Sequence, residues 1–398
     1  MDNFNWRVYR ELHKDLINAK LDTEQQIIDH WNKHGKYEGR YYKVTDVTPD
    51  FNWEEYKLLN VDLEEAGVVE KEFVELHWIR HGMSEKRKYK INNPSPYKTY
   101  LLQNYKTLYR INDLLNKGDD NIFIHKVINE HIIDNNTISI MMASSDRSKQ
   151  TYFTLETISK SSYKNIQIIL VDDSTNDPVD PNIIKKYGMH IELITIKNKF
   201  WSNPCVNYNI GFKYIRGNFI IIQNAEVCHV GDVLDYVINN VKDNEYYAFN
   251  VGALSDMKTN EELYKIKDMT SDNYTKIVNL IAIWYRHHKY NGVFWHFLVS
   301  MTKKTFDMFG GFDIDYALGI LYDDVEFEFR VKNTNLKLIN APENIIGIHQ
   351  WHRGIHPKIQ MRNELLWNWK YKYYCNNKKY LFLYKLSPLE LVRMVNSL

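Results

Sequence analysis

The sequence predicts a three-layer α/β/α domain preceded by an all-α region that contains two copies of one repeat. The repeats are visible directly, because Phe4–Val44 and Phe51–Ile91 align without a gap. From residue 137 onward, short apolar runs alternate with helical patterns, which is typical of a mostly parallel sheet covered by helices. Polar clusters follow several of these runs, and ligands bind at the carboxyl ends of the strands in such sheets.

Composition restricts the class of protein. The chain has 398 residues, 44% of them hydrophobic and 25% charged, which allows two or three domains with cores. Its 51 basic and 50 acidic residues nearly balance, so binding to nucleic acid or to an anionic membrane is not expected. No signal-peptide pattern and no apolar run near the ~20 residues of a transmembrane helix occur. The 3 cysteines form no Cys-x-x-Cys pair, which favours a reducing compartment, and we expect a cytoplasmic protein.

Each repeat is expected to fold as a small helical hairpin. Apolar residues at helical spacing open the unit, and a second helix through Trp31 is expected to stop at Gly35. His30 and His34 share one face of this helix, as a zinc pair would, but no Glu follows His30. We favour packing of the hairpin as the role of these residues, with carbohydrate or partner contact and metal binding as alternatives. The pattern resembles repeats that are appended to many glycosyltransferases.

The remaining elements follow in order along the chain. A breaker cluster at 92–96 ends the repeats, and Leu101–Ile111 is expected to be helical. The α/β region contains four expected strands and two expected helices: strands Ile138–Met142, Ile166–Val171, Ile191–Ile196 and Phe219–Ile222, and helices Gln150–Ser159 and Cys205–Ile215. A basic, aromatic tail is expected to dock on this domain, with a partner or membrane surface as the alternative. The predicted domains are repeat 1 (1–47), repeat 2 (48–94), a helical linker (95–136), the α/β domain (137–360) and a helical tail (361–398).

The first motif ends the second strand of this region, where Asp172 and Asp173 follow IQIILV. With ISIMMASSDR as the preceding strand and loop, then a helix and YKNI, residues 137–232 resemble family 2 glycosyltransferases of the GT-A fold. The resemblance implies that both aspartates contact the base and ribose of a sugar nucleotide, since carboxylates accept strong hydrogen bonds from such groups. A turn-forming pair is the alternative. The other residues assigned to the nucleotide are Ser144, Asn209 and Asn224.

The second motif departs from the family pattern. The family's Asp-x-Asp holds Mg²⁺ or Mn²⁺ on the diphosphate and corresponds here to Asn224-Ala225-Glu226. Asn224 is neutral and is expected to coordinate weakly or to reach only the ribose. We expect a divalent metal, Mn²⁺ or Mg²⁺, on Glu226 with help from His229 and a later histidine. A metal-poor site that binds the diphosphate through other donors is the alternative.

Residues 308–330 contain the groups expected to perform the chemistry. This stretch resembles the family's Gly-Gly-Phe-Asp segment followed by Asp-Asp. The resemblance implies that Asp324 is the general base of inverting transfer, which takes the proton of the acceptor hydroxyl, and that Asp323 orients the acceptor. It also assigns Gly311 and Asp313 to the donor-sugar and acceptor sites. The alternative is that Asp323 and Asp324 cap the helix that they begin, a role that is compatible with catalysis.

The last motif, IIGIHQWHRGIHP at 345–357, places three histidines at positions 349, 352 and 356. Family members often have a metal ligand or diphosphate contact here, so His349 and His352 are assigned as metal ligands. Arg353 is expected to neutralise the leaving diphosphate. Trp351 and Trp201 are assigned to the sugar sites.

Together these motifs predict an inverting glycosyltransferase that moves a sugar from a UDP- or GDP-sugar to a hydroxyl of a glycan or glycoconjugate. Neither the P-loop pattern nor the Gly-x-Gly-x-x-Gly pattern of dinucleotide sites occurs. A catalytically weak carbohydrate-binding or scaffold protein is the first alternative, because Asn224 departs from the family. A nucleotide-sugar pyrophosphorylase is the second, although the loop with Arg147 and Lys149 lacks the glycines that it needs.

Overall fold

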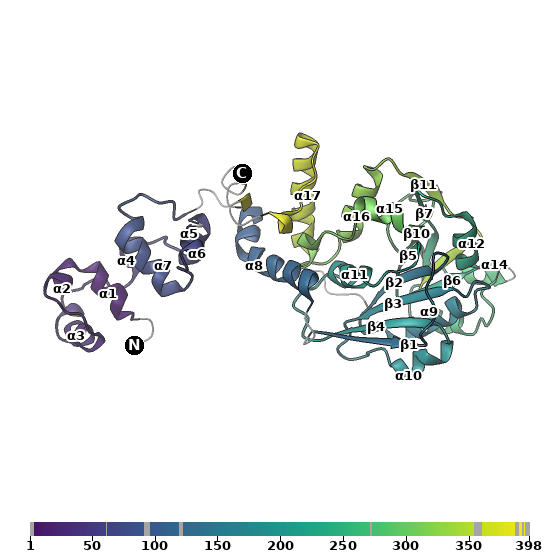
Figure 1. Ribbon diagram of the computed structural model, residues 1–398, viewed down its shortest axis with the longest axis horizontal. Helices are drawn as coiled ribbons and strands as arrows, with labels where there is room; N and C mark the ends of the chain where they lie inside the picture. Colours follow the sequence, from purple (N-terminus) through teal and green to yellow (C-terminus); the bar gives the residue numbers. More distant parts are fainter. Residues whose placement is uncertain are drawn as a thin grey trace. The chain divides into compact units, whose positions relative to one another are not determined.

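A computed structural model of the chain describes residues 4–60, 62–90, 96–118, 122–270, 273–353, 360–386, 390–391 and 394 (Figure 1). It divides into two compact units, one of residues 1–106 with 385–398 and one of residues 107–384. The breaker at 92–95 and His356 lie outside the described residues. Within the described part of the chain, no helix has the length and apolar character of a membrane span.

The two repeats fold as matching sets of short helices. The first copy has α1 (Trp6–Leu12), α2 (Lys14–Asn18), α3 (Glu24–His30) and a π-helical turn (Trp31–Gly35). After α4 (Val44–Val47), the second copy has α5 (Trp53–Leu59), α6 (Asp62–Glu65), α7 (Lys71–His77) and a π-helical turn (Trp78–Gly82). The side chains of Asn5 and Asn52 cap α1 and α5 by accepting from backbone N–H groups.

The residues shared by the two copies hold each hairpin together. Tyr9 Oη lies 3.2 Å from His30 Nδ1, and the same pair in the second copy, Tyr56 and His77, lies 3.0 Å apart. A Cβ atom on Gly35 would collide with Tyr9 Oη, so the turn needs a glycine where the tyrosine approaches. These contacts support the packing interpretation of the histidines.

The region expected as a helical linker is not wholly helical. Helix α8 (Pro96–Lys117) includes the expected helix, but strand β1 (Phe123–Ile128) follows it and pairs antiparallel with β4 (His190–Ile196) at the edge of the main sheet. The middle of β1 is exposed and carries His125 and Lys126, so it lacks the apolar pattern that marks buried strands.

The α/β unit contains a main sheet of eight strands and a second sheet of four. The main sheet has the order β1-β4-β3-β2-β5-β10-β7-β11, with β2 (Ile138–Ser144), β3 (Ile166–Asp172), β5 (Phe219–Asn224), β7 (Glu245–Ala248), β10 (Leu298–Thr302) and β11 (Lys337–Asn340). The second has the order β6-β12-β8-β9, formed by Val227–Val230, Ile346–His349, Asn250–Ala253 and Ile283–Arg286. Strands β4, β3, β2 and β5 run parallel, whereas β10 is antiparallel to β5 and β7.

Alternate residues of the central strands face two separate cores. Ile140 and Ile168 pack with α9 (Ser148–Ser159), α10 (Pro181–Ile184) and α12 (Val233–Asn240). Met141 and Ile169 pack with α8, α11 (Cys205–Phe212) and α16 (Asp323–Lys332). The remaining helices are α13 (Met257–Tyr264), α14 (Tyr274–Val278), α15 (Lys303–Phe309) and α17 (Gln360–Asn377). The unit is therefore the three-layer α/β/α domain of the GT-A type that the sequence predicts.

Candidate active site

A cleft of about 230 Å³ opens at the carboxyl ends of β2, β3 and β5. The register explains its position, because Ser144 pairs with Asp172 and Ala143 with Asn224, so the three strands end side by side. The cleft brings together residues expected at the site from widely separated segments: Ser144, Asp173, Asn224, Glu226, Asp323 and Asp324.

Asp173 presents an acceptor to the cleft, whereas its neighbour does not. Asp173 Oδ2 accepts from Lys199 Nζ and from Asn207 Nδ2, each at 2.7 Å, while Oδ1 is buried without a hydrogen-bond partner among the described residues. The Asp172 carboxylate instead accepts from Ser174 and from the backbone N–H of Val179 at 2.8 Å, and it does not line the cleft. The Asp172 carboxylate thus supports the turn that follows β3, and Asp173 is the member of the pair that lines the cleft.

Glu226 is buried at the centre of a charged group. Its Oε1 accepts from Arg147 and lies 3.3 Å from His349 Nε2 and 3.3 Å from His352 Nε2. Burial opposes ionisation here, but the Arg147 guanidinium and the two imidazoles hold the pKa of Glu226 well below its usual value. Glu226 is thus a carboxylate at neutral pH. Its second oxygen, Oε2, is buried without a hydrogen-bond partner in the described part of the structure.

These three side chains fit a divalent metal. One ligand atom from each of Glu226, His349 and His352 lies within 4.8 Å of the others, and the unpartnered Oε2 supplies a further acceptor. Carboxylate and imidazole are both common ligands of divalent metals. His229 is not a member of this group, and its Nε2 lies 2.8 Å from Gln223 Oε1. The three candidate ligands therefore do not include the expected His229.

Asp323 and Asp324 begin α16 at the rim of the cleft. The two residues before them, Leu321 and Tyr322, have φ of 63° and 68°, a left-handed conformation that is uncommon outside glycine. Asp323 Oδ1 accepts from Asn203 Nδ2 at 3.0 Å. Burial and the neighbouring charge of Asp323 raise the pKa of Asp324 to about 7, so this carboxyl exchanges its proton near neutral pH.

Trp201 and Gly311, expected at the sugar sites, and Asn209, expected at the nucleotide, are not among the residues that line the cleft. Trp201 is buried, and its Nε1 donates to Asn207 Oδ1 at 2.8 Å. Asn209 clamps the backbone of Phe312 through two hydrogen bonds of 2.8 Å. Gly311 packs against that amide, where a side chain would collide with Asn209 Oδ1. These contacts support the frame of the site, and the expected ligand contacts of the three residues stay predictions.

Asp313 and Trp351 also lie outside the cleft. The Asp313 carboxylate is fully buried and forms an ion pair with Lys370 of α17. The Trp351 carbonyl accepts from Gln150 Nε2 at 3.0 Å and from Asn260 Nδ2 at 2.8 Å, and its ring packs in a neighbouring apolar cluster. Both residues thus have structural partners, and their expected sugar contacts stay predictions.

Helix α17 holds the loop that carries the acids. Lys370, fully buried, pairs with Asp315 as well as Asp313, and Asn363 Nδ2 donates to the Leu321 carbonyl at 2.8 Å. The C-terminal tail thus docks on the α/β unit through α17, as expected. No local pattern marks Lys370 as important, because its partners lie 57 and 55 residues away along the chain.

Arg147 and Lys199 are cleft residues that the motifs did not assign to the site. Arg147 follows β2, contacts Glu226, and lies 3.2 Å from His352 Nε2. Lys199 follows β4 and pairs with Asp173. A basic residue just past the end of a strand is the signal that would have found both. Arg353, expected near the leaving group, is exposed.

Comparison with known proteins identifies the central part of this unit. Residues 139–303 match the model of glycosyl transferase family 2, which makes this segment a glycosyltransferase domain. The matched segment includes Asp173 and Glu226, whereas Asp324, His349 and His352 follow it. No curated protein sequence matches the chain.

Solved structures resemble the chain at low identity. TarS from S. aureus is 11% identical, with 56% of this chain and 37% of that chain covered and a TM-score of 0.41. TarS 1–349 in complex with UDP-GlcNAc is 12% identical, with coverage of 55% and 60% and a TM-score of 0.40. The mannosyltransferase PcManGT from Pyrobaculum calidifontis, in complex with GDP-Man and Mn²⁺, is 10% identical, with coverage of 76% and 78% and a TM-score of 0.40. The chain thus spans from about a third to three fifths of the length of the TarS structures.

Proposed function

We propose that the protein is an inverting glycosyltransferase that moves a sugar from a UDP- or GDP-sugar to a hydroxyl of a glycan or glycoconjugate. One observation carries this proposal: Asp173, Glu226 and Asp324, from three distant segments, line one cleft at the carboxyl edge of the sheet of a glycosyltransferase domain. The three acids supply the three functions that transfer needs, namely nucleotide binding, neutralisation of the diphosphate through a cation, and proton removal from the acceptor.

The nucleotide end of the cleft is formed by β2 and β3. Asp173 Oδ1 has no partner among the described residues and is available to accept from the base or ribose. Ser144 lies beside it, at the end of β2. Lys199 and Asn207 fix the other oxygen of Asp173, so that the free one keeps its direction.

The diphosphate is placed near Glu226. A divalent metal, Mn²⁺ or Mg²⁺, would be held by Glu226, His349 and His352. When bound, such a metal supplies positive charge to the leaving diphosphate. Arg147 adds a fixed positive charge at the same place, which would also neutralise the leaving diphosphate.

Asp324 is the proposed general base. A pKa of about 7 suits a group that must be ionised at neutral pH and still accept a proton as the hydroxyl attacks the anomeric carbon. Asp323, fixed by Asn203, is proposed to orient the acceptor.

The test uses Asp324→Asn in the full chain. Donor binding, measured by calorimetry with UDP- and GDP-sugars, should be nearly unchanged, whereas transfer should fall by about 10²–10⁴-fold. Transfer near the wild-type rate would place the base elsewhere. The main alternative, a carbohydrate-binding scaffold, is favoured only by Asn224. Slow release of UDP or GDP from the donor without acceptor distinguishes the enzyme from a scaffold, and formation of a nucleotide sugar from its triphosphate would indicate a pyrophosphorylase.

A further inference from the structure

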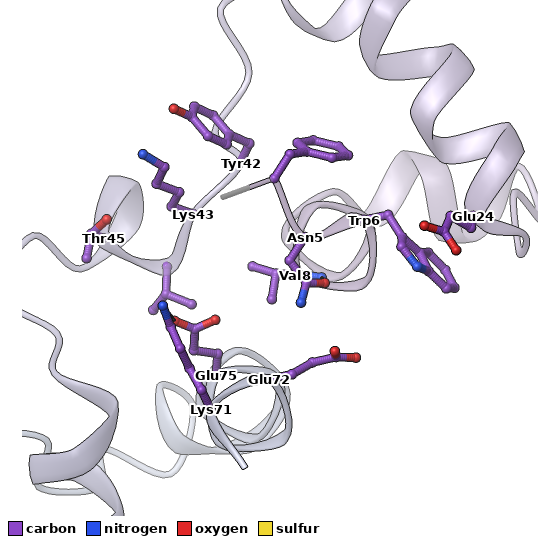
Figure 2. Close-up of a pocket in the computed structure, with 12 residues that line it drawn as sticks. Asn5, Trp6, Val8, Glu24, Tyr42, Lys43, Thr45, Lys71, Glu72 and Glu75 are labelled. Carbon is purple, nitrogen blue, oxygen red and sulfur yellow. Dashed lines mark hydrogen bonds and ion pairs between the residues drawn. The ribbon is translucent and has the colours of Figure 1, made fainter. Parts of the chain in front are cut away.

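A second cavity, of about 620 Å³, lies within the repeat region between the two copies (Figure 2). Its volume falls in the range of roughly 300–1,000 Å³ that is usual for sites of small ligands. Asn5, Trp6 and Val8 line it from the start of α1, and Figure 2 places Trp6 and Glu24 together on one side. The remaining walls come from two other segments: Tyr42–Thr45, and Lys71, Glu72 and Glu75 of α7.

The duplication separates residues that build the fold from residues that face this cavity. The shared pairs Tyr9–His30 and Tyr56–His77 contact each other inside their own hairpins. Three charged positions at the cavity differ between the copies. Glu24, Glu72 and Glu75 of the cavity correspond, at the offset of the repeats, to Lys71, Gln25 and Ile28. The fold of the hairpin therefore does not require these three glutamates. Their position around one cavity is better explained by a role in binding.

The cavity combines an aromatic surface with carboxylates and ammonium groups. Trp6 is partly buried, with the Arg7 guanidinium 5.1 Å from its ring centroid. The Glu75 carboxylate is only 17% exposed, its burial raises its pKa, and its nearest ion-pair partner, Lys71 Nζ, is 3.9 Å away. Glu75 thus has unused hydrogen-bonding capacity inside the cavity.

This combination matches the chemistry of a carbohydrate. The C–H faces of a pyranose pack on aromatic rings, and its hydroxyls donate to carboxylates in strong, charge-assisted hydrogen bonds. Three glutamates and two lysines line the cavity, and Arg7 neutralises Glu72, so the charges nearly cancel. A strongly charged ligand such as a phosphate or a basic peptide is therefore not favoured over a neutral one.

We propose that the cavity between the repeats binds a neutral carbohydrate, a sugar unit of the glycan that carries the acceptor. That the sugar belongs to the acceptor glycan rests on the proposed function, whereas the binding of a carbohydrate in this cavity does not. The repeats would hold the glycan by a part that does not react, which raises the concentration of its acceptor end near the transferase domain.

The chain contains its own control for this proposal. Trp53 occupies the position of Trp6 in the second copy, where Lys57 Nζ lies 5.7 Å from its ring centroid, and it does not line the cavity. The experiment measures binding of the full chain to an array of immobilised glucose, galactose, mannose and N-acetylhexosamine oligosaccharides. Trp6→Ala should weaken binding to the recognised oligosaccharide by about tenfold or more, and Trp53→Ala should leave it within about twofold.

A second variant covers the case in which Trp6→Ala unfolds the repeat. Glu75→Gln keeps the shape of the side chain and should weaken binding by about threefold to tenfold, with an unchanged circular dichroism spectrum. The proposal is overturned if the wild type binds no oligosaccharide on the array, if Glu75→Gln binds like the wild type, or if Trp53→Ala weakens binding as much as Trp6→Ala. Release of UDP or GDP from the donor, measured on the same samples, reports the transferase function separately.

Discussion

The side-chain amide of Asn203 donates to Asp323 Oδ1 at 3.0 Å, and this bond fixes the charge next to the proposed base. The hydrogen bond from Asn203 favours the ionised form of Asp323, although burial raises the pKa of that carboxyl. A charged Asp323 in turn raises the pKa of Asp324, because two adjacent carboxylates resist simultaneous ionisation. The basicity of Asp324 is therefore set in part by a residue that does not touch it.

The pH profile of the reaction follows from this relationship. Asp324 must be ionised to act as a base, so kcat/KM should rise with pH and level off above about 7. Asn203→Leu removes the hydrogen bond, Asp323 then keeps its proton more readily, and the rising limb should move to lower pH. The measurement is the pH dependence of kcat/KM for both proteins. If the rising part of the profile stays at the same pH in Asn203→Leu, or moves to higher pH, the coupling of the two acids is contradicted.

The Asp324 carboxyl is also expected to lower the stability of the protein, by an amount that depends on pH. A carboxyl whose pKa rises on folding, here from 3.8 to about 7, stabilises the protein below its unfolded value and loses this contribution as pH rises through 7. Asp324→Asn has no charge to bury, so its Tm should exceed that of the wild type at pH 8. Near pH 4 the two Tm values should converge. Thermal melts of both proteins at both pH values test this. The same difference in Tm between variant and wild type at pH 4 and at pH 8 would show that Asp324 does not titrate between them.

The parts of the fold and site that the sequence predicted are those specified locally. Apolar runs such as Ile166–Val171 are buried strands, and the acid that follows this run, Asp173, faces the cleft because parallel strands end along one edge. Strand β1 was missed, since an exposed edge strand has no apolar run. Asp313 was misplaced for a different reason, because its partner Lys370 comes from a distant helix. Ion pairs between distant segments have no local signature.

Metal dependence is the next prediction. EDTA should abolish most of the transfer, and Mn²⁺ should restore it. His349→Ala removes one of the three ligands and should raise the Mn²⁺ concentration for half-maximal activity by about tenfold or more. His131→Ala, at an exposed histidine of the same unit outside the ligand group, is the control and should respond like the wild type. Full activity in EDTA would contradict the metal site, and Arg147 would then supply the positive charge at the diphosphate.

Lys370 links the C-terminal helix to the catalytic loop, and its removal should affect both stability and rate. Lys370→Met leaves Asp313 and Asp315 buried without their cation, which costs about 3–5 kcal/mol when charged partners are lost in an interior. This corresponds to a loss of roughly 6–20 °C in Tm for a domain of this size. The loss should be larger at pH 8 than at pH 5, because burial raises the pKa of Asp315 to about 7 and this carboxyl can take up a proton at the lower pH.

The effect on rate follows from the loop that these residues hold. Asp313 and Asp315 precede the left-handed Leu321 and Tyr322, which deliver Asp324 to the cleft, so a loosened loop should lower kcat more than it changes donor affinity. Lys372→Met, on the same helix but exposed, is the matched control and should keep the Tm and kcat of the wild type. Thermal melts and steady-state kinetics on the three proteins measure both quantities. If Lys370→Met keeps the wild-type kcat below its own melting temperature, then α17 stabilises the domain without positioning the base.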